Sequence, residues 1–502
     1  MNKFRKMLAI ATAVTSCATF AGCAAGGGAV DGYSESTLEI DYWSSGYGIP
    51  YMKALVEEFK KDNPDIDVQL TLSSAVTTGD IYNRSDDNTT DLYISTMETY
   101  MAYSNLLEPL DDVLTMTSDG VQVKDRLGEE YLSAMKQVDG HTYALPWADG
   151  LCGLVYNADV FDEKGYTEPK TTDQLISLAL AMKSDGYTPF IYYKDYWMYM
   201  IQVWMQQLVG ENVFRGYWNG EWTNSDGSKE ANSIKVFKET ETKRDVFNVL
   251  YDLFSPKGYT YTGTNALSHT VAQTYFLNGY GLMMPNGSWI QAEMKSTESK
   301  VKNIKMMKAP VISSLGKQIG LSENQLIAAV AYVDGDELTL AQQTAVAAMS
   351  EETIERVREA RNLTYSEKTQ FHMLIPAYAA GKDAAKRFIS FYYSDKALRI
   401  QEENGVKLSA DYSDGTKHKL SYENSSVFDQ SLLRIDNDCK RVYMTLNSKL
   451  MYDGGINRLW HYDPVASFTY GTDMITVDKY FEKENSYWDG EWANILINAD
   501  LA

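Results

Sequence analysis

The sequence predicts an α/β fold built from two units, each with a sheet covered by helices. A β-α-β pattern begins near residue 38, a second begins near residue 150, and no long linker separates them. Such a pattern implies parallel strands with helices packed on the sheet. The length of 502 residues exceeds the ~100–200 residues of a typical domain, which also favours more than one packed unit.

The first unit opens with a strand, a helix and two further strands. Alternating apolar residues predict strands over 38–42 and 66–72, and an apolar run predicts another over 92–95. Pro50 begins the helix between the first two strands, and its apolar side chains recur at helical spacing. In open sheets ligands lie beyond the carboxyl ends of the strands. The loop 43–49 is therefore a candidate binding segment.

The second unit repeats this logic with longer gaps between its elements. An apolar run predicts a strand over 151–156, a helix follows between Thr172 and Gly186, and another strand is expected over 281–284. The acidic, helical pattern of 336–366 predicts a pair of helices inserted at the surface. A long helix is expected over 384–403.

The first residues have the pattern of an export signal. A basic start precedes an apolar run that is too short for a membrane-spanning helix, which needs ~20 residues. Phe20-Ala21-Gly22-Cys23 resembles the lipobox of bacterial lipoproteins, in which the cysteine becomes the new N-terminus and carries lipid. We expect residues 1–22 to be a signal peptide, acyl chains such as palmitate on Cys23 to anchor the protein, and 23–37 to be a flexible tether. An ordinary secretory signal, with Cys23 incidental, is the alternative.

Charge and cysteine content narrow the function classes. Without the three basic residues of 1–22, the chain carries 43 basic and 68 acidic residues, a net charge of −25. This balance disfavours nucleic-acid binding, which needs clustered Lys and Arg. Cys152 and Cys439 remain beside Cys23, and free thiols are favoured over a disulfide between them. The chain holds 36 Tyr and 10 Trp but only 16 Phe, so flat apolar faces with polar edges are abundant.

Several stretches, in order and behind a lipobox, resemble the extracellular solute-binding proteins of bacterial ABC importers. They are YMKALVEEFKKDNPDIDVQL, DLYIS with YSNLLEPLDD, YALPWADGLCGLVYNADVFDEKGYTEPKTTDQL, GYTPFIY and FLNGYGLMMPNGSW. The resemblance is to the sugar-binding group that includes maltose-binding protein, and it covers most of 38–300, with 303–405 matched more loosely. It implies a two-lobe, periplasmic-binding-protein-like fold with a hinge and a ligand cleft between the lobes.

The resemblance also implies how the chain divides between the lobes. An N-terminal lobe is expected from 38–147 and about 303–400, with the helical insertion at 336–366. A C-terminal lobe is expected from 148–302 and about 401–502. The second crossing between lobes is the least defined of these boundaries.

Candidate ligand-binding residues follow from the family positions that this sequence matches. An indole ring covers the C–H face of a pyranose, and carboxylate or amide groups bond the hydroxyls at its rim. The candidates are Trp43, Ser45, Tyr47, Glu98, Trp147, Asp149, Asp195, Tyr196, Trp197, Trp289 and Trp460. Trp289 is the strongest candidate for stacking.

The resemblance implies a tethered receptor that binds an oligosaccharide. Its expected partners are that ligand and the membrane subunits of an ABC permease. A monomer without cofactor or metal is expected, anchored on the outer face of the cytoplasmic membrane of a Gram-positive-type bacterium. The histidines show no metal-ligand spacing and no phosphate loop is present. The alternative is an exported glycoside hydrolase, which needs two carboxylates ~5–5.5 or ~6.5–9.5 Å apart. No nucleophile motif marks such a site.

Overall fold

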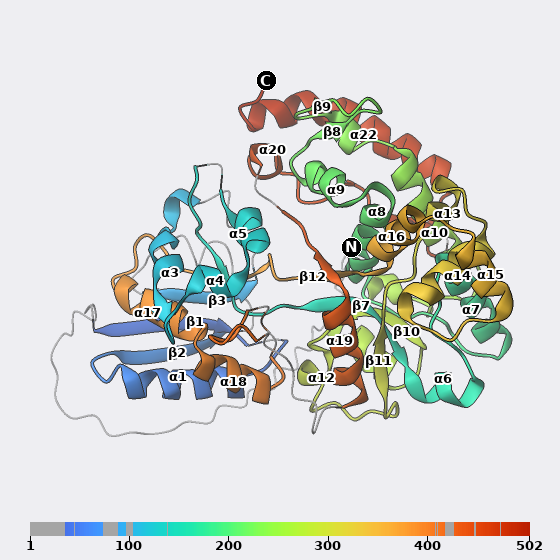
Figure 1. Ribbon diagram of the computed structural model, residues 1–502. Helices are drawn as coiled ribbons and strands as arrows, with labels where there is room; N and C mark the ends of the chain where they lie inside the picture. The colour runs from blue at the N-terminus through green and yellow to red at the C-terminus, as the bar shows by residue number, and fades with distance from the viewer. Residues whose placement is uncertain are drawn as a thin grey trace, which may run out of the picture.

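The computed structural model describes residues 36–44, 46–73, 89–96, 104–137, 139–406, 408, 410–416, 426–445, 448–471 and 473–502. These residues form two lobes, each built on a five-stranded sheet, which Figure 1 shows side by side. Of the described residues, those between 36 and 147 and between 371 and 416 form the N-lobe. Those between 148 and 370 and between 426 and 502 form the C-lobe. The predicted two-lobe α/β fold is confirmed.

The N-lobe sheet has the strand order β2-β1-β3-β13-β6. β1 runs parallel to both β2 and β3, whereas β13 is antiparallel to β3 and β6. In Figure 1, α1 and α18 lie below this sheet and α3 and α4 lie above it. The elements are β1 (Thr37–Trp43), α1 (Pro50–Asp62), β2 (Asp67–Ser73), β3 (Leu92–Thr96), α3 (Asp111–Thr115), β4 (Thr117–Ser118), β5 (Val121–Gln122), α4 (Val123–Leu127), α5 (Glu129–Met135), β6 (Leu145–Pro146), β13 (Phe371–Leu374), α17 (Lys382–Tyr392) and α18 (Asp395–Glu403).

The C-lobe sheet has the strand order β10-β7-β12-β14, and β11 also pairs with β7. β7 (Leu151–Asn157) is buried along its whole length, as its apolar sequence predicts. The other elements are α6 (Ala158–Lys164), α7 (Thr172–Ser184), α8 (Met198–Val209), α9 (Glu211–Trp218), β8 (Trp222–Thr223), β9 (Lys229–Glu230), α10 (Glu241–Phe254), α11 (His269–Leu277), β10 (Met283–Gly287), α12 (Ile290–Glu293), β11 (Ile304–Met307), α13 (Ser314–Gln318), α14 (Glu323–Asp334), α15 (Leu340–Ala347), α16 (Glu351–Arg361), β12 (Leu363–Ser366), α19 (Val427–Asp438), β14 (Lys440–Val442), α20 (Lys449–Tyr452), α21 (Pro464–Phe468) and α22 (Val477–Asn498).

Two passages between the lobes are hydrogen-bonded to each other. The first connects β6 to β7 and the second connects β12 to β13. Trp147 N donates to Phe371 O at 3.2 Å, and Glu367 N donates to Gly150 O at 3.0 Å. The two passages therefore lie side by side and form one hinge.

The second crossing lies about 65 residues later than the sequence suggested. β11 is antiparallel to β7 over Ile304–Met307, and β12 joins the same sheet at Tyr365 and Ser366. Residues 303–370 thus belong to the C-lobe rather than the N-lobe. The chain returns to the N-lobe only at β13, after β11 and β12 have both joined the C-lobe sheet beside β7.

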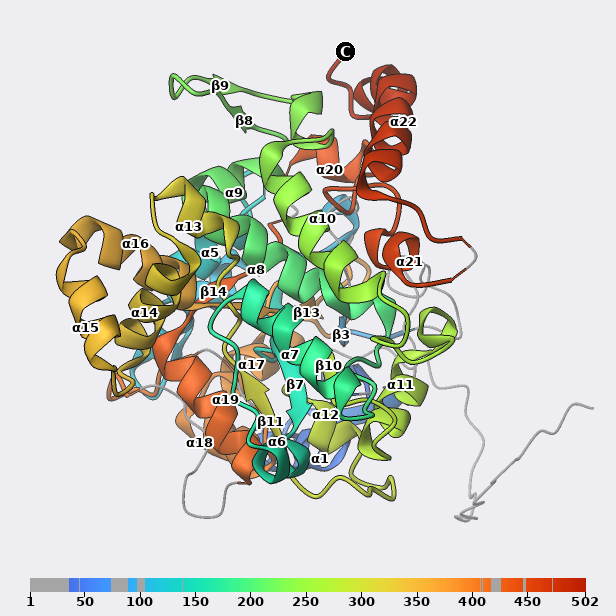
Figure 2. The ribbon, with the colours of Figure 1, turned by 90° about the vertical axis from the view of Figure 1, so that its right-hand side faces the viewer.

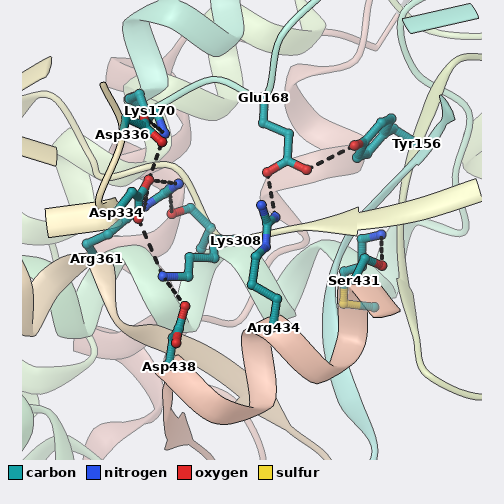
Figure 3. A network of polar contacts seen from close by, with 12 residues as sticks. Tyr156, Glu168, Lys170, Lys308, Asp334, Asp336, Arg361, Ser431, Arg434 and Asp438 are labelled. Atoms are coloured by element: carbon teal, nitrogen blue, oxygen red, sulfur yellow. Dashed lines mark hydrogen bonds and ion pairs between the residues drawn. The ribbon is translucent and has the colours of Figure 1, made fainter. Parts of the chain in front are cut away.

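Buried ion pairs bind the helical insertion to the C-lobe. Asp334, at the end of α14, lies 2.7 Å from Arg361 Nη2 and 2.8 Å from Lys170 Nζ (Figure 3). Lys308 Nζ is 3.4 Å from Asp334 and 2.9 Å from Asp438. Although burial raises the pKa of Asp334, Arg361 and Lys170 hold it well below its usual value. In Figure 2, α14, α15 and α16 accordingly stack along one side of the C-lobe.

Two helix boundaries differ from those predicted from the sequence, whereas the state of the two cysteines agrees with the prediction. The helix expected over 384–403 is two helices, because Ser394 caps α18 by accepting a hydrogen bond from Ala397 N at 3.1 Å. Thr171, one residue earlier than expected, caps α7. Cys152 and Cys439 are both buried free thiols, as predicted, and burial raises the pKa of Cys439 to about 11.

Candidate functional site

A pocket of about 330 Å³ lies between the two lobes. Its N-lobe wall is formed by Trp43 and Thr96, the last residues of β1 and β3, and by Gly46 in the loop after β1. This is the place where ligands meet parallel sheets, beyond the carboxyl ends of the strands. The hinge and the C-lobe supply the other described lining residues: Tyr193, Asp195, Tyr196, Met198, Tyr199, His269, Trp289, Glu293, Glu367, Gln370, Phe371 and Arg458.

Aromatic rings from both lobes and from the hinge surround this pocket. The Trp289 ring meets Phe371, on the hinge, edge-to-face at 6.0 Å and meets Tyr196 in the same way at 6.1 Å. Trp43, from the N-lobe, lies 6.4 Å from Phe371. Trp289 is 6% exposed, so most of its surface is held by these neighbours while the remainder lines the pocket.

Two glycines allow Trp289 to lie against the backbone. A Cβ atom added at Gly287 would lie 2.1 Å from the indole ring, and one added at Gly150 would lie 2.9 Å from it. Both approaches are far closer than side chains tolerate, so any other residue at these positions would displace the ring. The motif PNGSW therefore positions its tryptophan through the glycine two residues earlier.

The lobes touch beside the pocket through Tyr47 and Ser288. The Tyr47 hydroxyl lies 2.9 Å from Ser288 Oγ, which joins the loop after β1 to the loop after β10. The Tyr47 ring also meets Trp147 and Phe371 edge-to-face at 5.7 and 6.1 Å. Burial raises the pKa of Tyr47 well above its usual value, so the hydroxyl keeps its proton. The two lobes are therefore in direct contact beside the pocket.

Asp195 and Arg458 form a charged pair on the C-lobe wall. Their closest atoms, Asp195 Oδ1 and Arg458 Nη1, are 3.4 Å apart. Burial raises the pKa of Asp195, but a hydrogen bond from Tyr193 and the charges of Arg458 and Lys194 together hold it below its usual value. Lys194 is itself paired with Asp463 at 2.6 Å.

Glu293 and Glu367 bring two further carboxyl groups to the pocket. Glu293 accepts a hydrogen bond from Gln273 Nε2 at 2.9 Å and lies 3.7 Å from His269 Nε2. Burial, followed by the charges of Glu293 and Glu367, raises the pKa of Tyr196 well above its usual value. Both carboxyl groups therefore act on the same phenol in the pocket wall.

A buried lysine and a buried glutamate hold the loop that carries Arg458. Lys243 Nζ donates to Leu459 O at 2.5 Å, directly after Arg458. Glu484, on α22, accepts from His461 N at 2.6 Å and from Trp488 Nε1 at 2.7 Å. The C-terminal segment thus contributes to the pocket wall through backbone bonds that fix one loop.

Four of the candidate residues from the sequence lie in the pocket wall, and a fifth lies beside it. The wall residues are Trp43, Asp195, Tyr196 and Trp289, and the neighbouring residue is Tyr47. Ser45, Glu98 and the lipidation candidate Cys23 lie outside the described residues.

Four other candidates are buried away from the pocket. Trp197 packs in the C-lobe core, 4.8 Å from Phe254, and Trp460 is 4% exposed beside Phe247. Trp147 donates through Nε1 to Ser95 O at 2.9 Å and lies behind Phe371, with its ring centroid 4.9 Å away.

Asp149 is a hinge carboxylate with partners inside the protein. It accepts a hydrogen bond from Ser366 Oγ and lies 3.1 Å from Arg441 Nε. It is wholly buried and does not line the pocket. Its place in the fold is therefore that of a group holding the first hinge passage to β12 and β14.

Several lining residues were not singled out from the sequence. Tyr199 follows Tyr196 at helical spacing, which is a signal that could have identified it. Glu367 and Phe371 lie on the second hinge passage, which was placed elsewhere. Glu293 and Arg458 belong to residue types that are abundant in this chain, so only the fold distinguishes them.

Comparison with known proteins places this geometry in a family. A model of the bacterial extracellular solute-binding proteins matches residues 45–398. The chain belongs to this family. It is 24% identical over 269 residues to the multiple sugar-binding protein of Streptococcus mutans serotype c, covering 50% of this chain and 56% of that protein. It is 23% identical over 286 residues to the diacetylchitobiose binding protein NgcE of Streptomyces coelicolor, covering 52% and 54%.

The solute-binding fold extends over nearly the whole chain. A solved chitin oligosaccharide binding protein has 18% identity and a TM-score of 0.57, covering 91% of this chain and 99% of that one. By sequence, the chain spans about half the length of the curated relatives it matches. Within the described ranges no helix is both long and apolar enough to cross a bilayer. The same residues contain no cluster of metal-binding side chains.

Proposed function

We propose that this solute-binding protein is an extracellular receptor that binds a carbohydrate, in particular an oligosaccharide, by lobe closure and delivers it to an ABC permease. The observation that carries the proposal is the pocket between the lobes, which combines indole and phenol rings with carboxyl groups. The sugars in the names of the two relatives support the ligand class.

The proposed contacts are Trp43, Asp195, Tyr196 and Trp289. An indole presents an apolar face to the C–H groups of a pyranose, while the Asp195 carboxylate accepts hydrogen bonds from sugar hydroxyls. Micromolar affinity requires about −8 kcal/mol. Ring contacts contribute about 1 kcal/mol each beyond their burial, and these contacts and the paired hydroxyls together act against the cost of association. Ser45 and Glu98 remain predicted contacts.

We also propose that the protein is a monomer tethered through Cys23. The lipobox-like sequence and the glycine-rich stretch after it support a lipid anchor with a flexible leash. A tether of this kind keeps the receptor beside its permease on the outer face of the membrane, as a Gram-positive-type cell requires. Metabolic labelling with a palmitate analogue tests this, since Cys23→Ser should abolish incorporation.

The alternative function is glycoside hydrolysis, because the pocket holds several carboxyl groups. A hydrolase needs one carboxyl group with a raised pKa to protonate the leaving oxygen. The pKa of Asp195 is lowered instead. This favours a binding role for that carboxylate.

A thermal-shift screen of oligosaccharides tests the proposed receptor. A ligand that binds only the folded protein stabilises it by RT ln(1 + [L]/Kd), about 2.7 kcal/mol at 100 Kd. We expect at least one neutral oligosaccharide to raise the Tm, and Trp289→Ala to abolish that rise. No shift with any sugar, or release of shorter sugars during incubation, would contradict the proposal.

A further inference from the structure

The described lining of the pocket is rich in negative charge. It contains the carboxyl groups of Asp195, Glu293 and Glu367 and only one permanently charged cation, Arg458. His269 is the other basic side chain in this lining. The neutral remainder is mainly aromatic. A ligand entering the pocket between the lobes loses part of its water, so each fixed charge acts on it more strongly than at an open surface.

Arg458 is already engaged by a carboxylate. Its Nη1 lies 3.4 Å from Asp195 Oδ1, and Leu459 O next to it is fixed by Lys243. An anionic ligand that approaches this guanidinium therefore also meets the negative charge of Asp195. Lys194, the neighbouring cation, is paired with Asp463 at 2.6 Å and is not part of the pocket lining.

Glu293 and Glu367 add two further carboxyl groups to the pocket lining. Glu293 receives its hydrogen bond from the uncharged amide of Gln273, which orients the carboxylate without cancelling its charge. Glu367 stands on the hinge, with its backbone fixed by Gly150 O at 3.0 Å. Burial is the main cause of the raised pKa of Tyr196, and the charges of these two carboxyl groups raise it further.

We propose that the pocket takes uncharged sugars and rejects acidic ones, with Glu293 and Glu367 setting this selectivity. The inference rests on the proposed carbohydrate-receptor function and adds the charge class of the ligand. A sugar carboxylate in this pocket loses hydration and meets like charges, and placing like charges together in a site suppresses the wrong partner. A sugar hydroxyl at the same place donates to the carboxylates instead.

Matched sugars that differ only in charge test the proposal. Diacetylchitobiose, mannobiose and raffinose are each titrated beside a derivative oxidised to the carboxylate at a primary hydroxyl. The methyl ester of each derivative keeps the added bulk without the charge. For any sugar that binds, we expect the carboxylate to bind at least tenfold more weakly than its ester, a difference of about 1.4 kcal/mol.

Charge-neutral variants identify the groups responsible. Glu293→Gln and Glu367→Gln should each reduce the ratio of ester to carboxylate affinity at least threefold. Glu298→Gln, at an exposed carboxylate outside the pocket, should leave that ratio unchanged. A general loss of folding or affinity lowers the affinities for the ester and the carboxylate equally, so it leaves their ratio unchanged.

The outcomes separate this inference from the function on which it rests. A carboxylate that binds as tightly as its ester overturns the charge selectivity while leaving a carbohydrate receptor. A ratio that stays the same in both Gln variants overturns the assignment to Glu293 and Glu367. Failure of every neutral and charged sugar to bind contradicts the proposed function itself, and the inference falls with it.

Discussion

Replacing Tyr47 with phenylalanine removes the hydroxyl through which the two lobes meet beside the pocket. That hydroxyl lies 2.9 Å from Ser288 Oγ. When the lobes separate, both hydroxyls bond water, so the substitution weakens only the arrangement in which the lobes are in contact. A hydrogen bond between uncharged groups contributes about 1 kcal/mol net. Because closure accompanies binding in the proposed function, we expect Kd to rise about fivefold.

Calorimetric titration of a double-mutant cycle measures this contribution. The phenylalanine ring keeps the contacts that Tyr47 makes with Trp147 and Phe371, so packing is preserved. Ser288→Ala should weaken binding by a similar factor, and the double variant should be no worse than either single one. Tyr332→Phe, at a phenol 48% exposed, is the matched control and should leave Kd unchanged.

Two results would refute the reasoning. Binding by Tyr47→Phe as tight as by the wild type would show that the hydroxyl pair contributes nothing to closure. Effects of the two single variants that simply add would show that the groups act separately. In either case the contact between the lobes would be a consequence of packing alone.

Three further predictions concern other parts of the molecule. Trp289→Ala should weaken sugar binding at least tenfold in calorimetry, and unchanged affinity would remove this ring from the site. Asp334→Asn leaves buried cations uncompensated and should lower the free energy of unfolding by about 3–5 kcal/mol. The half-exposed Asp336→Asn should cost less than about 1 kcal/mol in the same urea titration, and equal losses would contradict the network. Burial lowers the pKa of Lys243 to about 7. The free-energy cost of burying this lysine in its protonated form is therefore greatest below pH 7 and declines as the pH rises. Stability should rise by about 1.5 kcal/mol between pH 7 and 8.5, and Lys243→Met should lose this rise.

The local part of the fold was predictable because it depends on short-range patterns. Alternation over 38–42 and 66–72 corresponds to β1 and β2, and the apolar run at 151–156 corresponds to β7. The spacing of apolar side chains along the chain locates such strands and helices to within a few residues. The two helices predicted within 336–366 were visible for the same reason and correspond to α15 and α16. The end of that range was wrong, because 363–366 form the buried strand β12.

The lobe boundary was not predictable from these patterns. β11 and β12 join β7 from more than 140 residues away along the chain, as their registers show. Pairing over such separations leaves no local signal. The helices between these two strands were therefore assigned to the other lobe.

Residue type alone also could not separate binding tryptophans from core tryptophans. Trp197 is wholly buried within its lobe, whereas Trp289 reaches the pocket because Gly287 leaves room for its ring. Arg458 entered the site from a segment with weak resemblance to the family. Its position depends on backbone bonds to Lys243 and on the helix that carries Glu484, which only the fold brings together.

Isothermal titration calorimetry with recovery of the sugar tests the central claim most directly. The protein is titrated with the oligosaccharide that gives the largest thermal shift, and the sugar is then analysed by mass spectrometry. The account predicts one site per chain, micromolar or tighter affinity, and sugar recovered intact. If heat continued to be released after saturation and shorter sugars were found in the calorimeter cell, the claim that the protein binds its ligand without changing it would be contradicted.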